Sequence, residues 1–310
     1  MNKVLCIGEL LMFFIGGEKD VNLAHQQAFM MKAGGAPANV ACVVGALGGE
    51  SMFYGAVGRD GFGDFLADTL KRFKVDTSNL IRSIKPTTLA FVSVAKNGAR
   101  DFVFVRGADA DLELTDLDVK SYEATKIVHF GAATAFLDGH LNRTYHQLLI
   151  NALADDKCVS FDPNYRSAFW EMDQKGFVER VMPFIEKAHL IKLSDEEAFL
   201  ISGLNDIEMA KVFFKSRFDG TFAITLGDKG VDLFNKEWSV HVPAIDVEVK
   251  DTTGAGDAFV GALLYSLSYS QKPLETLKDQ SIMKEFARIA NDVAASVCTE
   301  YGALTALARL

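Results

Sequence analysis

Residues 251–259 read Asp-Thr-Thr-Gly-Ala-Gly-Asp-Ala-Phe, a glycine-rich turn that leads into a helix predicted for residues 255–266. Gly254 and Gly256 allow a ligand to approach the backbone closely. The helix points its unbonded N–H groups and the positive end of its dipole at the turn, an arrangement that binds anions. Asp257 lies in the first helical turn. It either stabilises the helix or acts as a general base for a substrate hydroxyl while the turn binds a phosphoryl group.

A second glycine stretch, Gly34-Gly35-Ala36-Pro37-Ala38-Asn39, leads into a helix predicted for residues 37–47. Proline is common at the first position of a helix, so the stretch by itself indicates only a tight turn. It also fits a glycine pair on which a sugar can lie, with Asn39 supplying both a donor and an acceptor.

On both sides of these turns, short apolar segments alternate with longer amphipathic ones. The predicted strands cover residues 4–8, 52–57, 127–131, 158–162, 190–193 and 222–226. The predicted helices cover residues 37–47, 62–73, 143–154, 195–202, 207–214, 255–266 and 283–298. Apolar strands that alternate with helices are typical of a parallel sheet covered on both faces. We therefore expect an α/β fold, a three-layer α/β/α sandwich with a mostly parallel central sheet.

Residues 89–95 and 100–106 interrupt this alternation, because they read as two strands joined around Asn97-Gly98. Such a hairpin predicts a small antiparallel β lid beside the main sheet, to which residues 13–31 add further strands. No Ser- or Pro-rich linker divides the chain. We therefore expect one domain over residues 1–310, with the lid as an insertion.

Composition excludes several classes of function. Apolar residues make up 49% and charged residues 24% of the 310, and the net charge is −9. A chain this acidic has no overall positive field for nucleic acid or for an anionic membrane surface. No apolar run of 18 residues predicts a membrane span. The four cysteines form no C-x-x-C pair and are expected to be reduced core residues of a cytoplasmic protein.

Other well-known functional motifs are missing from the sequence. No Gly-Lys dipeptide occurs, so a Walker A loop is excluded. No G-x-G-x-x-G follows the first predicted strand, which disfavours a dinucleotide-binding dehydrogenase. Neither the zinc-protease motif H-E-x-x-H nor the hydrolase motif G-x-S-x-G occurs.

Ligands of open parallel sheets bind beyond the carboxyl ends of the strands, and polar or glycine residues gather there in this chain. These residues are Asp162, Asn164, Arg166, Lys192, Ser194, Glu197, Thr225, Gly227 and Gly230.

Taken together, the motifs are similar to those of one family. They lie at residues 8–11, 34–39, 58–63, 162–166, 192–197, 225–230 and 251–257. On these residues the sequence resembles the ribokinase-like (pfkB) carbohydrate kinases over nearly its whole length, and within them the fructokinases. The resemblance implies ATP-dependent phosphorylation of a primary sugar hydroxyl, with fructose as the expected substrate and fructose 6-phosphate as the product.

The resemblance also implies roles for individual residues. Asp257 matches the catalytic base, Gly254, Ala255 and Gly256 match the anion hole, and Arg166 assists at the phosphates. The sugar would contact Gly34, Gly35, Asn39, Arg106, Asn164 and Asp257. The nucleotide would contact Lys192, Ser194, Thr225, Gly227, Gly230 and Asn291. Glu197 would organise the water shell of Mg²⁺, and Asp251 and Thr253, with the loop of residues 298–305, would bind a monovalent cation such as K⁺.

Two positions depart from the family pattern. Ser194 stands where many members have Asn, and Phe13 stands where members usually carry an Asp that binds sugar hydroxyls. Polar contacts set discrimination between substrates, so the loss leaves the choice of sugar open. The alternatives are 2-keto-3-deoxygluconate or another sugar of the same family, and, in a different class, a sugar-binding regulator without catalysis. The sequence does not decide whether two lids pair in a homodimer.

Overall fold

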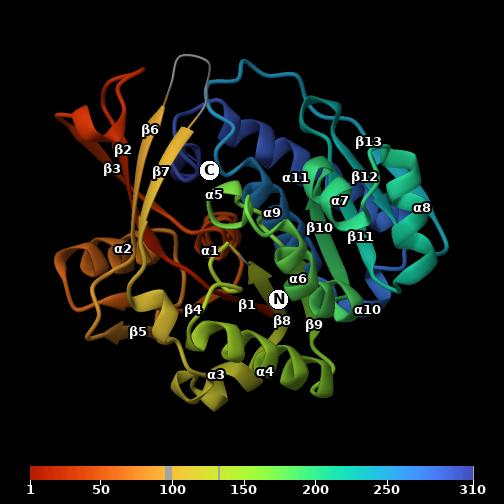
Figure 1. Ribbon diagram of the computed structural model, residues 1–310. Helices are drawn as coiled ribbons and strands as arrows, with labels where there is room; N and C mark the ends of the chain where they lie inside the picture. The colour runs from red at the N-terminus through yellow and green to blue at the C-terminus, as the bar shows by residue number, and fades with distance from the viewer. Residues whose placement is uncertain (95–99, 132, 310) are drawn as a thin grey trace.

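The computed structural model describes residues 1–94, 100–131 and 133–309. Its larger sheet has the strand order β13-β12-β11-β10-β9-β8-β1-β4-β5 (Figure 1). The strands are β1 (Lys3–Ile7), β4 (Ser51–Gly58), β5 (Leu80–Ser83), β8 (Thr125–Gly131), β9 (Cys158–Asp162), β10 (Leu190–Ser194), β11 (Thr221–Thr225), β12 (Val231–Phe234) and β13 (Ser239–Val242). All pairs from β5 to β11 are parallel, whereas β11–β12 and β12–β13 are antiparallel. The expected mostly parallel sheet is confirmed.

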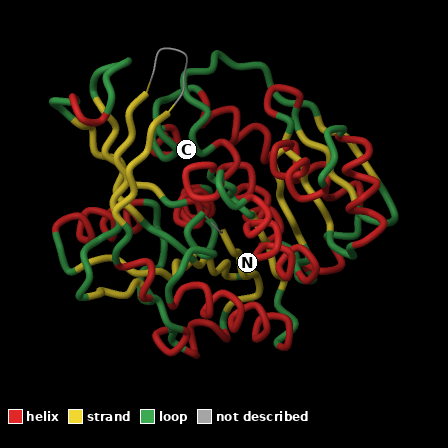
Figure 2. The backbone as a smooth tube through the Cα atoms, viewed as in Figure 1, coloured by secondary structure: helices red, strands yellow, loops and turns green. Residues whose placement is uncertain are grey.

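Helices cover both faces of this sheet (Figure 2). One hydrophobic core lies between the sheet and α1 (Ala36–Ala46), α2 (Gly61–Arg72), α9 (Ala255–Ser268) and α11 (Gln280–Cys298). The other lies between the sheet and α4 (His140–Ala154), α6 (Gln174–Lys187), α7 (Asp195–Ser202) and α8 (Ile207–Arg217). The short helices are α3 (Val119–Glu123), α5 (Ser167–Trp170) and α10 (Pro273–Thr276), and 3₁₀ turns lie at Leu23–His25, Ala108–Asp111, Leu114–Asp116, Gly227–Lys229 and Ala306–Arg309. The three expected layers are present.

A smaller sheet stands beside the main body, with the strand order β3-β2-β6-β7. It contains β2 (Leu11–Gly16), β3 (Phe29–Gly34), β6 (Leu89–Val94) and β7 (Arg100–Val105). The β2–β3 and β6–β7 pairs are antiparallel, and β2 joins β6 in parallel. The sheet and its two contributing segments are as expected, while the Asn97-Gly98 turn falls outside the described residues.

The predicted elements all occur, with ends shifted by a few residues. α6 was not predicted, because Pro183 lies inside it and interrupts the helical pattern. β12 and β13 were not predicted either, and they extend the main sheet as an antiparallel edge. No helix in the described ranges is both long and apolar enough to cross a bilayer.

Candidate functional site

The glycine-rich turn ends at Gly254, which is the N-cap of α9 and has a left-handed φ of 82°. A Cβ at this position would lie 2.3 Å from Cβ of Ala303, so glycine is required by both conformation and space. The first helical turn carries Asp257, which is only 8% exposed. The expected anion-binding turn and the expected base therefore occupy one helix start.

Asp257 is joined directly to the second glycine stretch. Nδ2 of Asn39, in the first turn of α1, donates a 2.8 Å hydrogen bond to Oδ2 of Asp257. The Asn39 Oδ1 atom is buried and has no hydrogen-bond partner among the described residues. A buried acceptor of this kind costs free energy unless something donates to it, and a substrate hydroxyl would do so. This contact brings two sites 218 residues apart in the sequence into one cluster.

The surroundings of Asp257 tune its acidity. Burial raises the pKa of its carboxyl from the ordinary value to about 6. The hydrogen bond from Asn39 and the positive charges of Arg166 and Lys192 lower that pKa, and the charge of Asp162 raises it. A carboxyl with a pKa near 6 is ionised at neutral pH and still basic enough to take a hydroxyl proton.

This environment predicts the acid limb of the pH–rate profile. Only the ionised carboxylate of Asp257 accepts a proton, so kcat/KM should fall about tenfold per pH unit below a pH of about 6. The Asn39→Ala variant loses a hydrogen bond that favours the ionised form. The acid limb of this variant should therefore move to higher pH, whatever the substitution does to KM. An acid limb near pH 4, or one that Asn39→Ala leaves in place, would contradict this assignment.

The glycine pair is shaped by two neighbouring residues. Gly35 has a φ of 121°, and a Cβ there would lie 2.2 Å from the carbonyl oxygen of Glu9. A Cβ at Gly34 would lie 2.3 Å from the ring of Phe13. Phe13 therefore packs against the glycine on which a sugar is expected to lie, and its ring helps to form this wall of the site.

Glu9 was not identified as a site residue from the sequence. Its Oε1 accepts a 3.0 Å hydrogen bond from the backbone N–H of Ala36, and the residue is 1% exposed. The pKa of its carboxyl is raised to about 8, chiefly by burial and also by the charge of Asp109, against the lowering effects of backbone hydrogen bonds and of Arg166. The available signal was a single carboxylate inside the apolar run that follows the first strand. Glu9 anchors the start of α1 and therefore the position of Asn39.

Polar groups meet where β9 and β10 end. Lys192 Nζ lies 3.2 Å from Oδ2 of Asp162 and 3.9 Å from Oε2 of Glu197. Asn164 has a φ of 51°, unusual for a residue with a side chain, and its Oδ1 accepts a 3.3 Å hydrogen bond from Arg166. Local strain of this kind is common at functional sites. The charges of Arg166, after β9, and of Lys192, in β10, both act on Asp257, so both strand ends contribute to the same cluster.

The nucleotide residues expected from the sequence lie along neighbouring strand ends. Ser194 caps α7 in a capping box with Glu197, and Oγ1 of Thr225 donates to the Leu193 carbonyl at 3.3 Å. Gly227 and Gly230 have φ values of 61° and 100° in the turn after β11. Nδ2 of Asn291, in α11, donates to the carbonyls of residues 242 and 243. Their placement at one edge of the sheet fits a nucleotide site.

Arg106 lies at the base of the small sheet. Its guanidinium donates to Oδ2 of Asp109 at 3.1 Å, to the Thr134 carbonyl at 3.0 Å and to the Asp138 carbonyl. Asp109, which is 1% exposed, also accepts from the hydroxyl of Thr88. In this structure Arg106 therefore fastens the small sheet to residues 134–138 of the body. Its expected contact with sugar stays a prediction.

The turn before α9 is tied to the C-terminal loop. Asp251 Oδ1 accepts from the backbone N–H of Thr253 at 3.0 Å and from its hydroxyl at 2.6 Å. Asp251 Oδ2 accepts from the N–H of Gly302 at 3.0 Å. Thus the residues expected to bind a monovalent cation are next to each other and connect the anion-binding turn to residues 298–302.

The side chains fit a magnesium ion that is bound mainly through water and phosphate. Glu197 is held by backbone N–H groups of Tyr165 (2.8 Å) and Ser194 (2.7 Å) on its two oxygens. No group of three or more His, Cys, Asp or Glu side chains in the described ranges could enclose a metal ion. Mg²⁺ usually keeps several waters and takes one or two carboxylates together with substrate phosphates. The expected role of Glu197 in ordering those waters stays a prediction.

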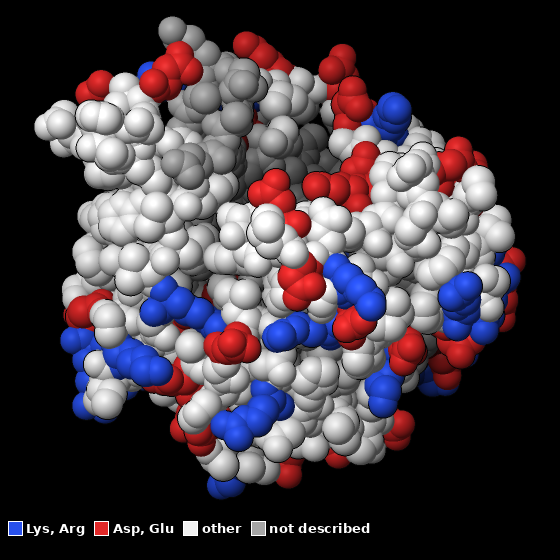
Figure 3. All heavy atoms as spheres, in the orientation of Figure 1, with Lys and Arg blue, Asp and Glu red and all other residues white. Residues whose placement is uncertain are grey.

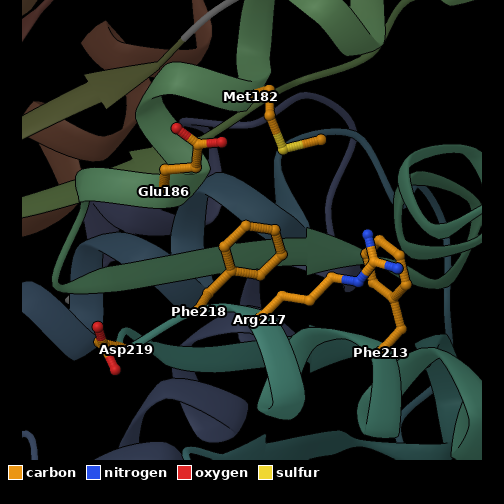
Figure 4. Close-up of a pocket in the computed structure, with 6 residues that line it drawn as sticks. All are labelled: Met182, Glu186, Phe213, Arg217, Phe218 and Asp219. Carbon is orange, nitrogen blue, oxygen red and sulfur yellow. The ribbon is translucent and has the colours of Figure 1, made fainter.

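Figure 3 shows a hollow between the small sheet and the main body, with acidic side chains at its rim. Across the opening, Phe104 of β7 packs edge-on against Phe169 of α5, with ring centroids 4.5 Å apart. A pocket of about 420 Å³ lies elsewhere, between α6 and α8, where Arg217 stacks on Phe213 (Figure 4). None of the expected site residues lines that pocket.

A family model, curated relatives and solved structures all indicate the same family. The model of the pfkB family carbohydrate kinases matches residues 1–309. A protein described as probable fructokinase-5 of Arabidopsis thaliana is 35% identical, over 98% of this chain and 94% of its own. The structure resembles a Vibrio cholerae fructokinase double mutant with bound fructose, ADP and potassium ion (TM-score 0.85, 30% identity, 99% and 95% of the two chains). It also resembles a Salmonella enterica aminoimidazole riboside kinase in complex with that riboside and an ATP analogue (0.82, 29%, 99% and 96%).

Proposed function

The chain belongs to the pfkB family of carbohydrate kinases, and from this premise we propose that it transfers the γ-phosphoryl group of ATP to a primary hydroxyl of D-fructose. The observation that carries the proposal is the hydrogen bond between Asn39 and Asp257. It joins the glycine pair expected to bind the sugar to the helix start expected to bind the phosphoryl group. The expected base, the expected anion-binding turn and the glycine pair expected to bind the sugar are thus neighbours, which supports the proposal.

The mechanism follows from these positions. The sugar lies on Gly34 and Gly35, and its hydroxyl donates its proton to the carboxylate of Asp257. The hydroxyl oxygen attacks the γ-phosphorus, the bond from that phosphorus to the bridging oxygen of ATP breaks, and ADP leaves with the electron pair. The N–H groups at the start of α9 and the charge of Arg166 stabilise the transferring group. Glu197 would order the water shell of a magnesium ion, which would supply further charge neutralisation. Since the protein performs no covalent step itself, the rate depends on positioning and electrostatics.

A sugar panel tests the proposed function. ADP release should be measured with D-fructose, 2-keto-3-deoxygluconate, ribose and aminoimidazole riboside as acceptors, and D-fructose should give the highest kcat/KM. The product should be fructose 6-phosphate. Equal, low ADP release with every acceptor would instead favour the sugar-binding regulator, and a clear preference for another acceptor would replace fructose as the substrate.

Phe13 gives a specific reason to keep another sugar of the family as the second candidate. Its ring lies against Gly34 and can offer only apolar contact. We predict that Phe13→Asp lowers KM for fructose by about tenfold or more, because charge-assisted hydrogen bonds to hydroxyls contribute about 1.5–3 kcal/mol. Phe13→Leu, which stays apolar, should leave KM nearly unchanged. If Phe13→Asp alters neither KM nor the order of preference among sugars, Phe13 does not contact the substrate.

A second prediction concerns the monovalent cation. We propose that K⁺ binds near Asp251, Thr253 and the loop of residues 298–305, since this segment positions the anion-binding turn. Turnover should be several-fold higher in KCl than in tetramethylammonium chloride at equal ionic strength and saturating Mg²⁺. Asp251→Ala should lose most of this response. The proposal is wrong if wild-type rates are the same in both salts.

We further propose that residues 1–310 form one kinase domain in which the small sheet acts as a lid. We also propose that the enzyme works in the cytoplasm, where ATP is supplied.

The outer face of the small sheet exposes apolar side chains. Phe29, Met31, Val103 and Val105 are 36–49% exposed each. An apolar face of this kind supports a homodimer formed through the two small sheets. The molar mass in solution tests the homodimer.

A further inference from the structure

Glu9 is a buried carboxyl group on the connection between β1 of the main sheet and β2 of the small sheet, and the proposed mechanism gives it no part. Its Oε1 accepts the hydrogen bond from the N–H of Ala36, the first residue of α1. The N-cap of this helix is Gly35, which has no side chain and so offers no capping acceptor. Glu9 therefore supplies, from 27 residues away, the acceptor that a helix start usually obtains from its own N-cap.

The backbone of Glu9 contacts the same helix start. A Cβ on Gly35 would lie 2.2 Å from the Glu9 carbonyl oxygen, so the two chain segments touch there. The N–H of Asn39 donates to the Gly35 carbonyl at 2.8 Å and begins the helical hydrogen bonds of α1. The other carboxyl oxygen of Glu9, Oε2, is buried and has no hydrogen-bond partner within the described ranges. The link to Ala36 is thus the polar contact through which this side chain reaches the site.

The helical turn that Glu9 holds carries a contact to the expected base. Nδ2 of Asn39 donates to Oδ2 of Asp257 at 2.8 Å, and this hydrogen bond lowers the pKa of the Asp257 carboxyl. Hydrogen bonds from N–H groups to oxygen keep distances of about 2.7–3.2 Å and weaken steeply when the angle worsens. A small shift of the start of α1 would therefore change the proton affinity of Asp257 without any new contact to it.

We propose that Glu9 is a positioning residue, which holds the start of α1 in place and so keeps the amide of Asn39 bonded to the carboxylate of Asp257. This inference deepens the proposed function, on which its kinetic readout rests. In this role Glu9 contacts neither sugar nor nucleotide and acts only through α1. Loss of its acceptor should weaken the bond from Asn39, and Asp257 should then bind its proton more tightly.

A second route from Glu9 to the base must be separated from this one. The groups that interact electrostatically with Glu9 come from three elements: Asp109 in the 3₁₀ turn after β7, Arg166 after β9 and Tyr145 in α4. Arg166 lowers the pKa of both Glu9 and Asp257. If Glu9 acted by competing for this charge, its loss would leave Arg166 to act more fully on Asp257 and would lower the pKa of the base. The two routes predict shifts of opposite sign.

The variants remove or keep the acceptor of Glu9. Glu9→Leu and Glu9→Ala have no acceptor for the Ala36 N–H, and Ala36→Pro removes the donor at a helix position where proline is tolerated, so the test does not depend on one variant folding. Glu9→Gln keeps an acceptor oxygen. It also matches the charge, because the pKa of Glu9 is raised to about 8 and the carboxyl is largely uncharged at pH 7. The control is Asp206→Ala, which removes the capping acceptor of α8.

The first readout needs no substrate. The carboxyl carbon of Asp257 is identified by NMR from its absence in Asp257→Asn, and its pKa is measured by titration. The variants that break the link should raise this pKa by about 0.5–1 unit, whereas Glu9→Gln and Asp206→Ala should leave it nearly unchanged. An unchanged or lower pKa in the folded variants that lack the link would overturn the proposal.

A double-variant comparison shows whether Glu9 acts through Asn39. In the Asn39→Ala background the hydrogen bond to Asp257 is already absent, so adding Glu9→Leu should cause no further shift of the Asp257 pKa. A further shift as large as that of Glu9→Leu alone would overturn the proposal, because Glu9 would then act on Asp257 by another path.

The second readout is kinetic, with whichever sugar the wild-type enzyme phosphorylates. The acid limb of kcat/KM in Glu9→Leu should move up by the same amount of about 0.5–1 pH unit, and KM for the sugar should rise several-fold with KM for ATP unchanged, since Asn39 is expected to contact the sugar. A lower kcat with a wild-type pH profile would indicate a purely structural role and overturn the proposal. If the wild-type enzyme phosphorylates no sugar, the proposed function is refuted, and the NMR titration still decides the role of Glu9.

Discussion

Replacing Asp257 by asparagine should lower kcat by about 10²–10⁴-fold, the usual cost of losing a general base. The amide has nearly the same shape as the carboxylate but cannot accept the hydroxyl proton. Burial disfavours the charged form of Asp257, so the neutral side chain should not destabilise the fold. Asn39 can still bond to it after its amide rotates. We therefore expect a folded enzyme that binds sugar and ATP but turns over slowly.

The matched control is Asp195→Asn. Asp195 is exposed in the first turn of α7, so it experiences the helix dipole as Asp257 does but faces solvent. If Asp257 serves only to stabilise its helix, both variants should lose a few tenths of a kcal/mol of stability and keep their kcat. The base assignment requires a large loss of kcat in Asp257→Asn only, measured by steady-state kinetics at pH 8 beside thermal unfolding. Near-normal turnover of Asp257→Asn would refute it.

The parts of the site that depend on local backbone chemistry were predictable from the sequence. The 251–257 turn needs glycine at 254 for its left-handed φ, and Pro37 marks the start of α1. Both signals are local, because they reflect the conformations that glycine and proline allow. The meeting of Asn39 with Asp257 is not local, and it was expected only because the family resemblance implies that both turns contact the sugar.

The parts that were missed depend on tertiary burial. Glu9 looks in the sequence like an interruption of an apolar run, and only the packing of α1 gives its carboxylate a partner in Ala36. Asp109 becomes a fixed partner of Arg106 only after the small sheet has docked on the body. No local pattern carries this information. α6 was missed for a different reason, since Pro183 imitates a helix end although α6 continues past it.

Gly254→Ala should be the second most damaging substitution. At a φ of 82° any Cβ costs about 1–2 kcal/mol, and here it would also lie 2.3 Å from Cβ of Ala303. Since neither backbone can remain in place, the start of α9 and the loop of residues 298–305 must separate. A shift of about 1 Å in a catalytic group can reduce the rate about 10²-fold, so we expect a loss of kcat of that order.

Gly48→Ala is the control for conformational strain, because Gly48 has a φ of 90° and a Cβ there would have no atom within 4 Å. It should lower the free energy of unfolding by about 1–2 kcal/mol and leave kcat unchanged. The steric part can be relieved in part, because Ala303→Gly removes the Cβ atom at 2.3 Å and leaves the Cα atom at 2.8 Å. The double variant Gly254→Ala/Ala303→Gly should therefore recover part of the lost kcat but not the strain energy. If Gly254→Ala instead loses stability to the same extent as Gly48→Ala and keeps full turnover, the turn at 254 does not position the phosphoryl group, and the anion-binding role belongs to the cations Lys192 and Arg166.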